Sequence, residues 1–191
     1  MHRRDVLLNL GATLAAGRLF GRPLEELWQL GAGVNDRLGR TAPRPAGPLG
    51  PFSARENEKI LTIAEHILPP SDTPGARDAR VNEFIALIVD EWYDHTERAR
   101  FLKGLAEVDQ RSQGLFGSDF LETTPAEQQA LLRGLEAEAT ALRQAGESTS
   151  GLFWPSIKGL TLYGYFTSQL VQTEVLKTVI KPGRFDGCVT M

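Results

Sequence analysis

The feature that most constrains the fold is the recurrence of apolar residues at helical spacing between residues 54 and 177. The first such segment repeats at intervals of three and four residues, at Ile60, Ile63, Ala64 and Ile67. A capping box of Ser53 and Glu56 predicts where this helix begins, and Pro69-Pro70 predicts where it ends. Strand-like alternation of any length is missing from the sequence. The sequence therefore predicts an all-α fold, a single-domain bundle of about five helices.

Three further helices follow from the same spacing. The second is predicted over 82–94, where the apolar face is wide. The third opens near Thr96 and fades at the glycines of 114–117. The fourth has the clearest start, because Thr124 caps it and Pro125 stands at its first helical position.

The last apolar segment, 152–177, has no broad polar face along its first half. A helix of this kind has to be covered on more than one side, by its own domain or by another chain. Gly159 and Gly164 lie inside it, and each costs about 1 kcal/mol in a helix interior. They predict the close approach of another backbone.

The N-terminal residues 1–22 are predicted to be a twin-arginine export signal. Arg3 and Arg4 stand beside the start, and a mildly apolar stretch over 6–17 follows them. This stretch is shorter than the about 20 apolar residues that span a bilayer. A cytosolic amphipathic helix that happens to begin with two arginines is the alternative. The signal predicts a periplasmic protein.

The remaining segments complete the predicted organisation. Residues 23–53 are rich in Gly and Pro and predict a linker, 54–178 form the helical domain, and 179–191 show no period and predict an extended tail. The tail contains Cys188, which is the only cysteine. It is either a free thiol or one half of a disulfide to another chain.

Composition excludes several classes of function. The net charge of −3 argues against nucleic acid, which needs clustered Lys and Arg. One cysteine cannot form an internal disulfide, a four-cysteine iron–sulfur site or a Cys-x-x-Cys-His haem attachment. Glu91 and His95 stand four apart, too few for a metal site, and no catalytic triad pattern appears. We expect no catalytic, cofactor or metal site in this chain.

Aromatic residues concentrate near the C-terminus, where six of the fifteen Phe, Trp and Tyr residues lie between Phe153 and Phe185. Aromatic residues and Arg are favoured at the buried centres of protein interfaces. The predicted partner interface comprises Trp92, Tyr93, Phe153, Trp154, Tyr163, Tyr165, Phe166, Arg184, Phe185 and Asp186.

Five segments, in this order and spacing, resemble the gluconate 2-dehydrogenase subunit 3 family. They begin Ile67-Leu68-Pro69-Pro70-Ser71-Asp72-Thr73-Pro74-Gly75, Val81-Asn82-Glu83-Phe84, Glu97-Arg98-Ala99-Arg100-Phe101, Leu160-Thr161-Leu162-Tyr163-Gly164-Tyr165 and Pro182-Gly183-Arg184-Phe185. The resemblance implies a small subunit that binds no flavin, supplies the export signal, and is needed for its large FAD-containing partner to mature and reach the periplasm. A cytochrome c subunit often completes such complexes.

The predicted function is therefore a non-catalytic small subunit of a periplasmic, FAD-dependent sugar or sugar-acid dehydrogenase complex. Its expected partners are the large flavoprotein subunit, a cytochrome c subunit and the twin-arginine translocase. The alternative is an independent periplasmic helical binding protein or enzyme. The two differ in that the subunit is expected to expose an apolar surface when it is expressed alone.

Overall fold

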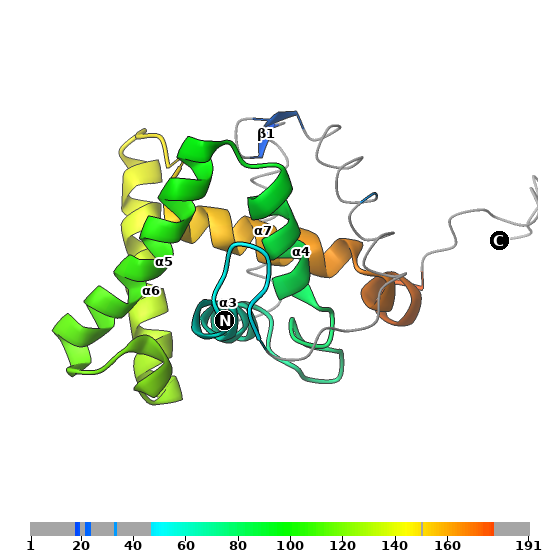
Figure 1. Cartoon of the computed structure of the whole chain (residues 1–191), viewed down its shortest axis with the longest axis horizontal. Helices are drawn as coiled ribbons and strands as arrows, with labels where there is room; N and C mark the ends of the chain where they lie inside the picture. The colour runs from blue at the N-terminus through cyan, green and yellow to red at the C-terminus, as the bar shows by residue number, and fades with distance from the viewer. Residues whose placement is uncertain (1–17, 20–21, 24–32, 34–46, 150, 178–191) are drawn as a thin grey trace, which may run out of the picture.

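A computed structural model describes residues 18–19, 22–23, 33, 47–149 and 151–177 (Figure 1). The long helices are α3 (Ala54–Ile67), α4 (Val81–Glu91), α5 (His95–Phe116), α6 (Pro125–Gln144) and α7 (Phe153–Thr167). A 3₁₀ turn, η1 (Phe120–Glu122), lies between α5 and α6, and a π-helical turn, η2 (Val171–Val175), follows α7. In the part of the chain that the structure describes, the strands are β1 (Arg18–Leu19) and β2 (Arg22–Pro23), two residues each and antiparallel. The all-α prediction is confirmed.

Helix α7 is the centre of the bundle, because it packs against each of α3, α4, α5 and α6. Figure 1 shows it in orange, crossing behind α4, with α5 and α6 side by side near its start. Its side chains Ile157, Leu160 and Leu162 are almost fully buried. The expectation that this segment is covered on several sides is confirmed within the chain itself.

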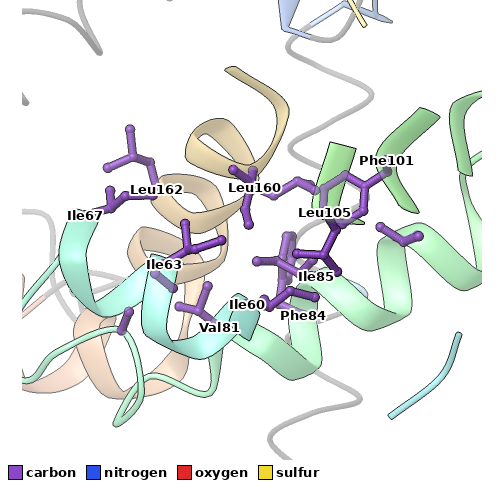
Figure 2. Close-up of a cluster of buried hydrophobic side chains, with 14 of the residues drawn as sticks. Ile60, Ile63, Ile67, Val81, Phe84, Ile85, Phe101, Leu105, Leu160 and Leu162 are labelled. Carbon is purple, nitrogen blue, oxygen red and sulfur yellow. The ribbon is translucent and has the colours of Figure 1, made fainter. Parts of the chain in front are cut away.

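Side chains from four helices meet in the core (Figure 2). Ile60 and Ile63 come from α3, Ile85 from α4, Leu105 from α5 and Leu160 from α7. The first four of these side chains have no accessible surface and the fifth has 3 %. Removing such side chains from water is the main term that stabilises the fold.

Two predicted helix starts are confirmed as capping boxes. The amide of Ser53 donates to Glu56 Oε2 at 2.8 Å, and the amide of Thr124 donates to Glu127 Oε2 at 2.8 Å. Gly117 ends α5 with φ +77°, a left-handed conformation that glycine adopts without strain. The glycine-rich end predicted for this helix is therefore also confirmed.

The end of α4 was predicted wrongly, at 94, while the start predicted for the next helix, near Thr96, is confirmed. The second helix ends at Glu91, and Asp94 caps the third by accepting from the amides of Thr96 and Glu97, both at 2.8 Å. The apolar spacing runs through Trp92, so the spacing does not mark where α4 ends. As a result, Glu91 and His95 belong to different helices and do not share one helix face.

The last segment was predicted as one helix to residue 177, but α7 stops at Thr167. Ser168 is extended, with φ −64° and ψ 145°. Its hydroxyl donates to the carbonyl of Tyr165 at 2.8 Å and accepts from the amide of Val171 at 3.3 Å. This local side-chain bonding competes with the helix ladder and turns the chain into η2.

A buried charge pair ties α3 to α5. Lys59 is 3 % exposed, and its ammonium pairs with Asp109 and donates to the carbonyl of Leu105 at 3.2 Å. The other Asp109 oxygen accepts from the amide of Phe120 at 3.2 Å. One carboxylate therefore fixes both the α3–α5 contact and the entry into η1.

Gly164 allows a close contact, but with a side chain rather than with the predicted backbone. A Cβ at this position would lie 2.8 Å from Phe84 Cδ1, and Phe84 is 1 % exposed. The ring of Phe84 also packs edge-on against Tyr163, with ring centroids 5.7 Å apart. Gly159, on the same helix, is half-buried.

The change Gly164→Ala should lower the free energy of unfolding by about 1–3 kcal/mol, because the new methyl group overlaps a buried ring that has no room to move. The matched control is Gly134→Ala on α6, where nothing lies within 4 Å of the added methyl group. That change should raise the free energy of unfolding by up to about 1 kcal/mol. Urea titration followed by circular dichroism measures both. Equal effects of the two changes would contradict the close contact.

Candidate partner interface

Apolar side chains reach the surface where α4 ends, α5 begins and α7 begins. We call Trp92, Tyr93, Leu152 and Phe153 the aromatic corner. Trp92 is 40 % exposed and Leu152 is 38 % exposed, while Tyr93 and Phe153 are half-buried. Large apolar side chains with this exposure are typical of contact surfaces when they gather in one place.

The buried ring of Phe101 holds the aromatic corner together. Its centroid lies 6.2 Å from that of Tyr93 and 5.2 Å from that of Phe153, both at edge-on angles. Edge-on pairs at this separation are favourable beyond simple burial. The rings from the α4–α5 turn and from α7 are therefore fixed relative to one another before any partner arrives.

Gly104 lets α7 approach α5 at this place. A Cβ on Gly104 would lie 2.2 Å from Phe153 Cβ, which is far inside contact distance. Beside this contact, a groove of about 120 Å³ opens between α5, α6 and the start of α7. Val108, Leu135 and Leu142 line it, with Leu152 and Phe153 at one wall. The charged residues Glu107, Arg111 and Glu138 line it as well, so the groove adds a mixed apolar and charged surface to the aromatic corner.

Glu136 on α6 anchors the start of α7 beside the groove. Its Oε2 accepts from the indole nitrogen of Trp154 and from Nζ of Lys158, each at 2.6 Å, and Oε1 accepts from Arg143 at 3.2 Å. Burial by itself would raise the pKa of Glu136, but the bonds from Lys158 and Trp154 outweigh it and lower that pKa. Glu136 therefore stays ionised at neutral pH and holds α6 against α7.

A family model described as gluconate 2-dehydrogenase subunit 3 matches residues 54–183. The chain belongs to this family. The match covers the five long helices that the structure describes, the groove and the aromatic corner. No curated protein and no solved structure gives a significant match.

As a member of the family, the chain is a subunit of a dehydrogenase complex. The resemblance that the sequence motifs indicated is thereby confirmed. Among the described residues, no helix is both long and apolar enough to cross a membrane.

The predicted interface residues that the structure describes lie in three places: the aromatic corner, the later part of α7 and the core. Trp92, Tyr93 and Phe153 form the aromatic corner. Tyr163 and Phe166 are half-buried on α7, away from the start of that helix. The export arginines Arg3 and Arg4 and the tail residues Arg184, Phe185, Asp186 and Cys188 lie outside the described residues.

Trp154 and Tyr165 require a correction, because this chain uses them for its own core. They are 8 % and 5 % exposed. Trp154 donates to Glu136, and the Tyr165 hydroxyl donates to the carbonyl of Pro74 at 2.7 Å. Aromatic residues on an all-apolar helix face every direction, so composition could not separate inward from outward rings.

Of the two histidines of the helical domain, one helps to join two helices and the other lies on the surface. His66 bonds to Gln128 Oε1 at 2.9 Å, which joins the end of α3 to α6. His95 is exposed at the first position of α5. Within 47–149 and 151–177, no three His, Cys, Asp or Glu side chains gather in a way that could hold a metal ion.

Sequence reasoning missed three components of the interface. Leu152 was predicted as the first residue of the last apolar segment but not as part of the interface, and Gly104 was not singled out. Glu136 looked like one carboxylate on a solvated face. The only sequence signal for Glu136 is that Trp154 and Lys158 stand four apart, on one side of a helix, where a single carboxylate can reach both.

The change Glu136→Gln should lower the free energy of unfolding by about 1–3 kcal/mol at neutral pH, because Lys158, 12 % exposed, loses its counter-charge. The pKa of Glu136 is lowered in the folded state, so its contribution is present above its ordinary pKa of 4.5 and is lost as pH falls through the folded value. Urea titrations at pH 7 and at about pH 3 should show a gap between wild type and variant that narrows in acid.

The matched control is Glu138→Gln, which breaks an exposed pair with Arg111. It should cost at most about 1 kcal/mol, because exposed pairs contribute little. A gap for Glu136→Gln that stays constant with pH would contradict the role of the ionised carboxylate.

Proposed function

We propose that this chain is the non-catalytic small subunit of a periplasmic, FAD-dependent sugar or sugar-acid dehydrogenase complex. In this role it escorts the large flavoprotein subunit through export and stabilises it during maturation. The observation that carries the proposal is the family match over 54–183, which includes every long helix of the bundle. The FAD would be bound by the large subunit, and a cytochrome c subunit would complete the complex.

The escort role draws its support from the N-terminal residues. Arg3 and Arg4, followed by an apolar stretch, form the pattern of a twin-arginine signal. That route carries folded cargo, so one signal can serve two chains only if they associate before export. The small subunit would therefore bind the large subunit in the cytosol and cross with it.

The binding surface is supported by the aromatic corner and the adjoining groove. Trp92 is exposed next to Tyr93, whose ring packs against Phe101. A preformed apolar surface binds well because little side-chain entropy is lost on association. The half-buried members Tyr163 and Phe166, and the tail with Arg184, Phe185 and Asp186, would extend the contact, and Cys188 could join the two chains by a disulfide.

Changing Arg3 and Arg4 together to Lys should strand both subunits in the cytosol. Lysine keeps the charge but loses the guanidinium geometry of the signal. Immunoblots of periplasmic and cytosolic fractions for both chains measure this. Export of the large subunit that continues unchanged would remove the escort role.

The change Trp92→Ser should weaken association with the large subunit by about tenfold or more, because a buried tryptophan at an interface commonly contributes over 1 kcal/mol. Leu115→Ser is the matched control, since Leu115 is 66 % exposed near the other end of α5. Copurification of a tagged large subunit with each variant compares them. Equal recovery of the two variants would place the interface elsewhere.

A further inference from the structure

The aromatic corner has an acidic surround. Asp90, Glu91 and Asp94 are all exposed and flank Trp92 and Tyr93 in the sequence. Asp90 pairs with Arg98 at 2.5 Å. Glu97 and Arg100 lie near the start of α5, so this part of the surface carries four carboxylates and two guanidinium groups. A ligand that fits this surface is apolar and carries positive charge at one end.

The polypeptide enters the helical body at the same place. Gly50 lies beside α4, where an added Cβ would stand 3.7 Å from Asp90 Cβ. Two residues later, the ring of Phe52 packs 6.0 Å from that of Phe101, the ring that supports the aromatic corner. Before Gly50 the chain runs toward the start of α4, where the carbonyl of Gly47 accepts from Asn57 Nδ2 at 2.9 Å and Asn57 Oδ1 accepts from Asn82 at 3.0 Å.

Those 46 preceding residues have the complementary composition. They contain seven arginines and four carboxylates, whereas the rest of the chain has a net charge of −6. Two apolar stretches occur in them. The stretch 24–30 contains Glu25 and Glu26, which the carboxylates of the corner would repel. The stretch Val6–Leu10 follows Arg3 and Arg4 after a single carboxylate, Asp5, so its flank keeps a net positive charge.

We propose that residues 3–10 dock onto the aromatic corner of the same chain before the large subunit covers it. Leu7, Leu8 and Leu10 would cover Trp92 and Leu152, and the two arginines would lie among the carboxylates around Asp94. Reach is no obstacle, since about 40 residues span more than about 100 Å when extended. The export signal is then held on the folded domain instead of being presented.

Photo-crosslinking tests this docking. Full-length chain, made by cell-free synthesis so that the N-terminus is retained, carries p-benzoylphenylalanine in place of Leu8. After irradiation, mass spectrometry of the monomer should find position 8 crosslinked to peptides that contain residues 90–101 or 151–155. Crosslinks to other faces, crosslinks between two copies, or no crosslink would each overturn the proposal.

Charge variants supply the control. The pair Glu91→Gln with Asp94→Asn keeps the helix cap, because asparagine also caps, and should lower the crosslink yield about fivefold. The pair Glu122→Gln with Glu174→Gln removes equal charge elsewhere and should leave the yield unchanged. An equal yield in both pairs would also overturn the proposal. The variant in which Arg3 and Arg4 are changed to Lys distinguishes the docking from the proposed function. Lysine keeps the positive charge that docking requires, whereas the same change abolishes export.

Discussion

Helix α7 has no polar face, and the rest of the structure is arranged to cover it. A helix that is apolar nearly all round is stable in water only when other elements bury every side. Here α3, α4, α5 and α6 each supply part of that cover. The close contacts at Gly104 and Gly164 both involve α7, because four helices can surround a fifth only if side chains interlock at short distance.

The start of α7 is where this cover is incomplete. Leu152 and Phe153 reach the surface there, and the turn between α4 and α5 adds Trp92 and Tyr93. The same place is also firmly built, because Glu136 accepts three hydrogen bonds from α6 and α7 and Phe101 holds two rings. A rigid apolar surface beside an incomplete cover is well suited to a subunit that functions within a complex.

Polar groups in this protein mainly position helices. Lys59 and Asp109 join α3 to α5, His66 and Gln128 join α3 to α6, and Tyr165 secures the loop before α4. Buried polar groups such as these are expensive unless every bond is made, so they favour one arrangement of the helices over others. They explain how a small helical domain can present a defined surface.

The sequence by itself determined the helical class, the number of long helices, two of the capping boxes, the glycine-rich end of α5 and the family. The helices and their ends depend on local spacing and on cap chemistry, which operate within a few residues, while the family was recognised from five segments in a fixed order. The tertiary structure alone decided that α4 ends before Trp92, that α7 stops at Ser168, and that Trp154 and Tyr165 point inward while Trp92 stays exposed. Which side of an all-apolar helix faces solvent depends on the neighbours that pack against it, and those neighbours are distant in the sequence.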